Sequence, residues 1–278
     1  MHFLTLSLLC ITWIASASAT GLILPLYLYP SAEYNDGAAN WKPVIAAASS
    51  SPSLPFLTVV NPFNGPGQSG QPGDADRNYI TGVSQLNALR NIKTIGYVRT
   101  NYSKAPMQEL KANMTIWKSW SSYKAANISI HGIFFDESAA NLSYMREAAD
   151  FARKLFGASA TTVVCNFGTT APEVYYDICD VVIAFESCLN CAMLPQYKGP
   201  ETIRANVPKR KAGRAAVIVN SFKGKAYDGA VADEALLKRY AGDVKKEGVG
   251  WAYFCSAGYN DVGSRPATIG ELAKDLRA

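Results

Sequence analysis

Histidine is scarce in this chain: the 278 residues contain only His2 and His131. Triad hydrolases need an imidazole beside the nucleophile, and metal centres built on several histidines need more than one. The chain also has little excess of either charge, because 27 Lys and Arg residues face 22 Asp and Glu residues, a formal net charge of +5 at pH 7. Basic and aromatic residues are not interleaved on any one stretch, so the sequence does not indicate nucleic-acid binding. The 49% hydrophobic and 18% charged composition is that of a globular protein.

Long apolar runs are absent except at the N-terminus. Residues 3–15 form one apolar run that leads to Ala17-Ser18-Ala19, the small-residue pattern of a signal-peptidase site. The run is shorter than the roughly 20 residues that a membrane-spanning helix needs. We therefore expect a signal peptide over residues 1–19, with an uncleaved signal anchor as the alternative, and a mature domain over residues 20–278. The protein is then secreted, extracellular or associated with the cell wall, without a stable membrane anchor.

Secretion changes the meaning of the cysteines. Cleavage would leave five of the six, and an oxidising compartment favours a structural disulfide within residues 179–191 over a metal or redox motif, with the pairing open. Five cysteines cannot all pair within one chain, so at least one stays a thiol, and Cys165 or Cys255 is the best candidate. Four Asn-X-Ser/Thr sequons are candidates for N-glycosylation: Asn101, Asn113, Asn127 and Asn141.

Eight short runs of apolar, mostly β-branched and aromatic residues predict eight buried parallel strands. They are residues 22–29, 56–62, 94–100, 128–135, 161–166, 181–185, 215–220 and 250–255. Between them, apolar residues at steps of three and four predict helices over residues 107–117, 142–156 and 237–244, the second capped by Asn141. A strand and a helix in about 32 residues, repeated eight times, is the pattern of a single (β/α)8 TIM barrel. The alternative is an open doubly wound sheet.

The active site of such a barrel is built at the C-terminal ends of its strands. Three carboxylates stand there, Asp136 and Glu137 after the fourth strand and Glu186 after the sixth. Glycoside hydrolysis needs two carboxyl groups that flank the scissile bond. The structural alternative is that Asp136 caps the following helix and Glu137 is solvated. Amides and aromatic rings, which suit the hydroxyls and apolar faces of sugars, gather at the same end: Tyr27, Tyr29, Asn61, Asn64, Tyr97, Tyr102, Asn166, Asn220 and Tyr259.

Two other patterns are weaker. Residues 65–70 match the GxGxxG pattern of dinucleotide sites, but Gln71-Pro72-Gly73 delays any helix and the next strand ends without an acid. A nicotinamide-dependent oxidoreductase is therefore a minor alternative, and we expect no cofactor and no metal. His131 precedes Asp136 by five residues on the same strand, so we expect it at the opposite end of the barrel, facing the core or a helix.

Several segments together resemble the spherulin-4-like family (spherulation-specific family 4). They are residues 25–30, 61–67, 96–102, 132–137, 166–169 and 185–186. The resemblance runs from about Leu24 to about Pro266. It implies a (β/α)8 barrel and a glycoside hydrolase that acts on α-1,4-linked N-acetylgalactosamine (GalNAc) in galactosaminogalactan. The family's functional acids correspond to Asp136, Glu137 and Glu186. The chain departs from the family at Phe167, where the family has proline, and at Cys255-Ser256, where its last strand ends in a threonine-like residue.

The leading hypothesis is a secreted endo-acting glycoside hydrolase with Asp136 and Glu186 as the catalytic pair and Glu137 as an additional essential acid. The polysaccharide is then the partner. The alternative is a non-catalytic glycan-binding protein of the cell surface or spore wall that uses the same groove. Which carboxyl group is the acid does not follow from the sequence, and the distance between the two would decide between retention and inversion.

Overall fold

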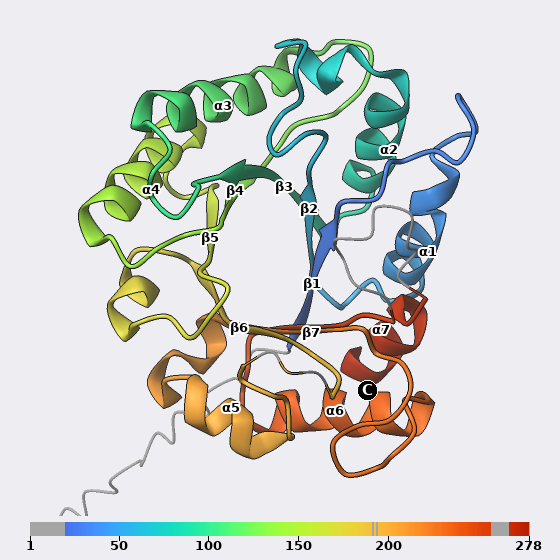
Figure 1. Cartoon of the computed structure of the whole chain (residues 1–278). Helices are drawn as coiled ribbons and strands as arrows, with labels where there is room; N and C mark the ends of the chain where they lie inside the picture. Colours follow the sequence, from blue (N-terminus) through green and yellow to red (C-terminus); the bar gives the residue numbers. More distant parts are fainter. Residues whose placement is uncertain (1–19, 191, 193, 257–266, 278) are drawn as a thin grey trace, which may run out of the picture.

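Eight parallel strands form a closed barrel in the order β1 to β8, and the helices lie outside it (Figure 1). The computed structural model describes residues 20–190, 192, 194–256 and 267–277, so the expected signal peptide (1–19) and Tyr259 lie outside the described residues. The predicted TIM barrel is confirmed. The strands are β1 (Gly21–Leu26), β2 (Phe56–Val60), β3 (Ile92–Arg99), β4 (Gly132–Asp136), β5 (Thr162–Asn166), β6 (Val181–Cys188), β7 (Ala215–Asn220) and β8 (Trp251–Phe254).

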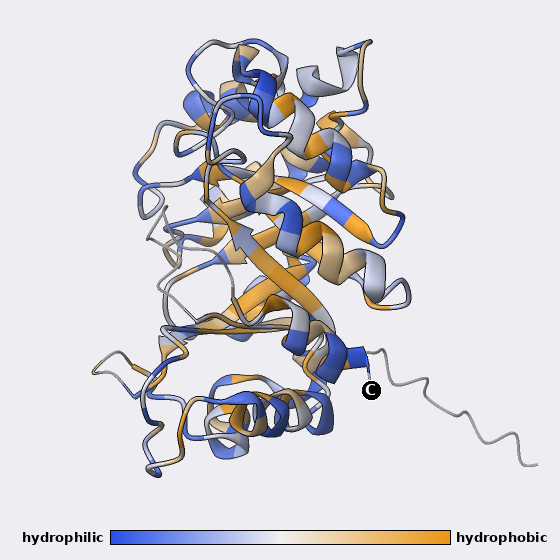
Figure 2. Ribbon diagram, turned by 90° about the vertical axis from the view of Figure 1, so that its right-hand side faces the viewer, coloured by the Kyte–Doolittle hydropathy of each residue, from blue (hydrophilic) through white to orange (hydrophobic). Residues whose placement is uncertain are grey.

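The strands are buried on both faces, which explains why they appear in the sequence as continuous apolar runs. All residues of β1 and β2 are buried, and Figure 2 shows hydrophobic strands at the centre with helices of mixed character around them. The three periodic patterns form α3, α4 and α6, and the Asn141 side chain accepts a hydrogen bond from the Tyr144 N–H as the predicted cap of α4. The helices are α1 (Lys42–Ser50), α2 (Arg77–Asn87), α3 (Met107–Ser119), α4 (Leu142–Phe156), α5 (Pro200–Asn206), α6 (Glu234–Lys246) and α7 (Ile269–Arg277).

Helix α3 packs closely on β3 and fixes the strand that carries Tyr97. A Cβ atom at Gly96 would lie 2.5 Å from the Trp117 ring, so only glycine allows this approach. The Trp117 indole N–H donates to the Tyr97 carbonyl at 2.8 Å. These contacts hold the C-terminal half of β3 rigidly at the point where it meets β4.

The cysteine predictions need a correction. Cys179 pairs with Cys165, with their Cα atoms 6.1 Å apart, so Cys165 is not the thiol and the partner of Cys179 lies outside residues 179–191. The reason is strand pairing, since β5 lies beside β6 with Cys165 opposite Val182, three residues from Cys179. Cys188 is also disulfide-bonded, and Cys191 lies outside the described residues. Cys255 is a buried thiol, as one of the two alternatives predicted.

No helix within the described part of the chain is long and apolar enough to cross a membrane.

Candidate active site

Two of the three predicted acids meet at the C-terminal end of the barrel, joined by one amide. Asp136 ends β4, Asn166 ends β5, and Glu186 lies near the end of β6. The Asn166 side-chain nitrogen donates to Asp136 Oδ1 and to Glu186 Oε2, both at 2.8 Å. Because the two oxygens share one donor atom, they are separated by no more than twice that distance, about 5.6 Å.

A β-bulge in β6 helps to aim Glu186. The pairing of β6 with β7 shifts register between Ile183 and Phe185. Bulges insert one residue, bend the strand and redirect the side chains beyond them, often next to active sites. Phe185 packs outward on Tyr197, with ring centroids 6.2 Å apart, and Glu186 therefore faces the opposite side, toward Asn166.

The two carboxyl groups have different environments. Burial, together with the charge of Asp136, raises the pKa of Glu186 to about 7, opposed only by the hydrogen bond from Asn166. The pKa of Asp136 is also raised, chiefly by burial, but three hydrogen bonds oppose the shift, from the Tyr97 hydroxyl, the Glu137 backbone N–H and the Asn166 amide. A carboxylate that accepts several hydrogen bonds is favoured in its charged form. The site thus pairs an acid that holds its proton near neutral pH with a better-stabilised carboxylate.

Two predicted tyrosines line the same end of the barrel. Tyr97 stacks on Phe134 with centroids 6.1 Å apart, and Tyr27 meets Tyr97 edge-on at 5.5 Å. Burial, reinforced by the charge of Asp136, raises the pKa of both phenols well above the usual value for tyrosine. Both therefore stay protonated, and the Tyr97 hydroxyl donates a hydrogen bond to Asp136.

Glu137 lies next to the pair but points elsewhere. Its backbone is left-handed, with a φ of 49°, and its carboxylate accepts a hydrogen bond from Arg99 Nε at 2.8 Å. Its carbonyl oxygen accepts hydrogen bonds from the Thr100 hydroxyl and the Tyr102 N–H. The charge of Glu137 still raises the pKa of Asp136, so the third acid influences the pair from outside it.

The other predicted residues have separate surroundings. The Tyr29 hydroxyl donates to Asp76 and accepts a hydrogen bond from Asn78, at the start of α2, while Asn61 accepts one from the Gly65 N–H within its own loop. Asn220 accepts a hydrogen bond from the Ser221 hydroxyl. Tyr102 and Asn64 are exposed at this end of the barrel.

Sequence reasoning missed the position of Arg99 beside the acids and the exposure of Phe63. Arg99 pairs in register with Asp136 across β3 and β4, and its position at a strand end beside two acids was the available signal. Phe63 stands in a loop after β2 with 62% of its surface exposed, which no pattern in the sequence distinguishes from a buried aromatic.

His131 lies away from the acids, as predicted from the strand direction. It directly precedes β4 and lines a hollow of about 440 Å³ at the N-terminal end of the barrel. The expectation that it faces the core or a helix is wrong, because the side chain is exposed; β4 begins at Gly132, later than the run from residue 128 predicted, so His131 belongs to the loop. Within the described ranges, no group of three or more His, Cys, Asp and Glu side chains is placed to hold a metal ion.

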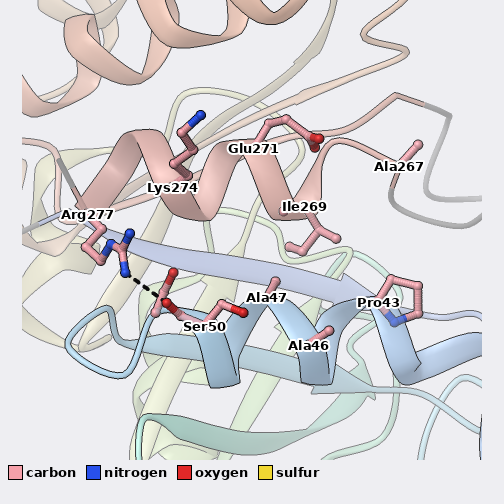
Figure 3. Close-up of a pocket in the computed structure, with 11 residues that line it drawn as sticks. Pro43, Ala46, Ala47, Ser50, Ala267, Ile269, Glu271, Lys274 and Arg277 are labelled. Carbon is pink, nitrogen blue, oxygen red and sulfur yellow. Dashed lines mark hydrogen bonds between the residues drawn. The ribbon is translucent and has the colours of Figure 1, made fainter.

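A larger hollow, of about 670 Å³, lies between α1 and α7 on the outside of the barrel (Figure 3). Its walls mix small residues, such as Ala46 and Ala47, with charged side chains of α7, and Arg277 closes one end by donating to the Ser50 carbonyl at 2.8 Å. Glu271 is the one carboxylate on its lining, so the hollow offers no second acid for catalysis.

Comparison with protein families finds one match: the family model of Spherulin4, the spherulation-specific family 4, covers residues 21–272. A search of curated proteins finds no match.

Among solved structures, the chain is similar to Aspergillus clavatus Sph3, crystallised in complex with GalNAc. The two share 23% identity with a TM-score of 0.76, over 94% of this chain and 98% of that one. A GH18 chitinase from Pseudoalteromonas aurantia aligns with a TM-score of 0.54 at 9% identity, over 92% and 98% of the two chains. A GH5-4 endoglucanase from Clostridium acetobutylicum gives 0.52 at 11% identity, over 95% and 98%. At these identities the likeness establishes the barrel fold.

Proposed function

The chain belongs to spherulation-specific family 4, and from that premise we propose that it is a secreted, endo-acting glycoside hydrolase. Its substrate is a polysaccharide with α-1,4-linked GalNAc, of the galactosaminogalactan type. The observation that carries the proposal is the pair Asp136 and Glu186, held on one Asn166 amide at the end of the barrel where TIM-barrel enzymes do their chemistry.

The environments of the two acids support a different role for each. Glu186, with its pKa raised to about 7, is the general acid that protonates the glycosidic oxygen of the leaving sugar. Asp136, stabilised in its charged form by three donors, is the nucleophile that attacks the anomeric carbon. In the second step Glu186, now deprotonated, takes a proton from water, which hydrolyses the glycosyl-enzyme and restores both groups.

The spacing supports retention of anomeric configuration. Retaining enzymes hold their carboxyl groups about 5–5.5 Å apart, whereas inverting enzymes leave about 6.5–9.5 Å for a water molecule. The shared amide limits the facing oxygens of Asp136 and Glu186 to about 5.6 Å, too close for the second arrangement.

The substrate class rests on two supports: the family resemblance implies GalNAc, and Sph3 was crystallised with GalNAc. The net charge of +5 disfavours long-range attraction of a fully deacetylated, cationic polymer.

Reducing-end release from galactosaminogalactan by the purified mature domain tests the proposal. We expect the wild type to release reducing ends, with the α-anomer formed first in NMR spectra, and Asp136→Asn and Glu186→Gln to lose at least about 10³-fold in kcat. Glu137→Gln serves as a matched carboxylate-to-amide control beside the pair and should lose less. Glycan binding without release by the wild type would favour the non-catalytic glycan-binding alternative. Full activity in both pair variants would refute the site assignment while leaving the activity in place.

Secretion has its own test. N-terminal sequencing of the protein recovered from a culture medium should begin at Thr20. A chain that begins at Met1, or that stays with the cells, would contradict the predicted signal peptide.

A further inference from the structure

A polar hollow of about 370 Å³ lies between the loop that follows β2 and the loop that follows β3. Phe63 and Asn64 form one wall, Asn101 lies on the other loop, and Glu109 and Asn113 of α3 complete the lining. Both loops leave the C-terminal ends of their strands, so the hollow opens on the same end of the barrel as Asp136.

Arg99 connects this hollow with the site. Its side chain lines the hollow, its guanidinium is bonded to Glu137, and its backbone is paired in register with Asp136. A polymer that places one sugar at the acid pair can therefore extend along Arg99 into the hollow.

The side chains of the three asparagines that line the hollow form no hydrogen bonds within the described part of the chain. None of the amides of Asn64, Asn101 and Asn113 forms a hydrogen bond with another described residue, although the amides of Asn61 and Asn166 at the same end do. Amide groups offer both donors and acceptors, which match the hydroxyl and acetamido groups of a sugar. Three such amides therefore surround one hollow, with no hydrogen-bond partner among the described residues.

Phe63 supplies the apolar component. Its ring lines the hollow and 62% of its surface is exposed, which leaves a large aromatic face open to a ligand. Binding sites combine such apolar surfaces with a few convergent polar groups, and an aromatic face beside amides suits the apolar face of a pyranose ring.

The charges of the hollow nearly cancel. Arg99 is paired with Glu137, and the positive charge of Lys104 is offset by Glu109. A lining of this kind gives no net attraction to a cationic or an anionic sugar, and so favours an uncharged one.

We propose that this hollow is a second sugar subsite, which takes an uncharged hexose or N-acetylhexosamine unit of the polymer whose neighbouring unit occupies the acid pair. The inference rests on the proposed function for the identity of the polymer. Contacts made by a remote sugar contribute to transition-state stabilisation at the reacting bond, so the subsite serves endo-cleavage of long chains.

Two of the asparagines, Asn101 and Asn113, also head sequons, and an N-glycan on either would fill the hollow. The test therefore uses protein made in bacteria, where both amides stay unmodified.

Calorimetric titration of the Glu186→Gln variant with α-1,4-GalNAc oligosaccharides of increasing length tests the subsite. We expect the affinity to rise about tenfold once the oligosaccharide is long enough to reach Phe63, and Phe63→Ala to abolish this gain while affinity for the shortest ligand is kept. Asn113→Ala should reduce the same gain. Tyr227→Ala, which removes an exposed aromatic ring on another loop, is the matched control and should leave the gain intact.

The outcomes separate this inference from the proposed function. An undiminished length gain in both Phe63→Ala and Asn113→Ala overturns the subsite, whether or not the wild type hydrolyses the polymer. A length gain that depends on Phe63, in a protein whose wild type releases no reducing ends, supports the subsite and counts only against catalysis. Equal affinity for fully acetylated and deacetylated oligosaccharides would refute the preference for an uncharged sugar.

Discussion

One asparagine amide organises each end of the barrel, but the partners of the two amides differ. At the N-terminal end, the Asn91 amide nitrogen lies 3.0 Å from the carbonyl oxygens of Ala48 and Ser51 and 3.1 Å from that of Leu54. At the C-terminal end, the Asn166 amide bonds to the two buried carboxyl groups. The same functional group therefore closes a backbone turn at one end and holds reactive groups together at the other.

The charges follow the same division. The hollow at the N-terminal end is lined by Arg90, Lys93 and His131, with no carboxylate among its lining residues. The C-terminal end carries the two acids Asp136 and Glu186, both of which are buried. A backbone carbonyl, such as those bound by Asn91, can do no acid–base chemistry. The amide of Asn166 marks the active site because its partners are buried and can titrate.

Alanine substitution of the two asparagines should separate the two ends most strongly. Asn166→Ala removes the donor shared by the acids, and we expect kcat to fall about 100-fold with a smaller effect on stability. Asn91→Ala removes the amide shared by three carbonyls, of which, within the described chain, those of Ala48 and Ser51 keep a backbone N–H donor and that of Leu54 does not, and we expect the free energy of unfolding to fall by about 2 kcal/mol with kcat of the folded protein retained. Turnover at saturating substrate and urea unfolding of both variants provide the measurements.

The comparison between the two amides fails if the loss of kcat and the loss of stability fall on the opposite variants. A large loss of kcat in stable Asn91→Ala, or a normal kcat in Asn166→Ala, would show that the partners of the amide do not decide its role.

The buried acid should also make stability depend on pH. The pKa of Glu186 is raised from 4.5 to about 7 in the folded protein, so the folded state binds the proton more tightly than the unfolded state. Its contribution to stability is therefore present at low pH and is lost as the pH rises from about 4.5 through 7. Glu186→Gln removes this loss, and we expect the variant to be about 3 kcal/mol more stable than the wild type at pH 8 but similar at pH 4.5.

Urea unfolding of the wild type and the variant at both pH values measures the difference. Glu247→Gln, which changes an acid in a surface ion pair with Arg204, is the control and should show no gain at pH 8. A gap between wild type and Glu186→Gln that does not grow with pH would contradict the raised pKa.

Removing the Tyr97 hydroxyl tests the nucleophile with a smaller effect. Its hydrogen bond lowers the pKa of Asp136, so Tyr97→Phe should raise that pKa. Because Asp136 acts in its ionised form, the acidic limb of the rate profile should move to higher pH, with about a tenfold loss of kcat/KM at pH 5 and less at pH 6.5. Tyr144→Phe, which removes a hydrogen bond from the hydroxyl to the Ala105 carbonyl in the loop before α3, should leave the limb in place. An unshifted limb in Tyr97→Phe would remove Asp136 from the role of nucleophile.

The sequence predicted the barrel and the three acids because both leave local signals. Apolar runs and helical periodicity depend on burial alone, and a strand end in a parallel barrel has a known direction. The separation of Glu137 from the pair left no such signal, because it depends on a left-handed backbone at Glu137 and on Arg99 across the next strand. The Cys165–Cys179 disulfide was missed for a similar reason: it follows from the register of β5 with β6, which spacing along the chain does not encode.

The basic end of the barrel should contribute least. Lys93→Ala removes one exposed hydrogen bond, from its ammonium group to the Thr162 hydroxyl at 3.0 Å, and His131→Gln replaces an exposed ring; we expect each to change kcat/KM less than about twofold and stability by about 0.5 kcal/mol or less. The histidine variant also settles which group produces the alkaline limb. Partial burial, with the charges of Lys93 and Lys118, lowers the pKa of His131, whereas burial raises that of Glu186 to about 7. Since Glu186 belongs to the acid pair and His131 does not, the alkaline limb should stay near pH 7 in His131→Gln. An alkaline limb that moves or disappears in that variant would place an essential titrating group at the N-terminal end of the barrel. The two ends would then no longer differ in function.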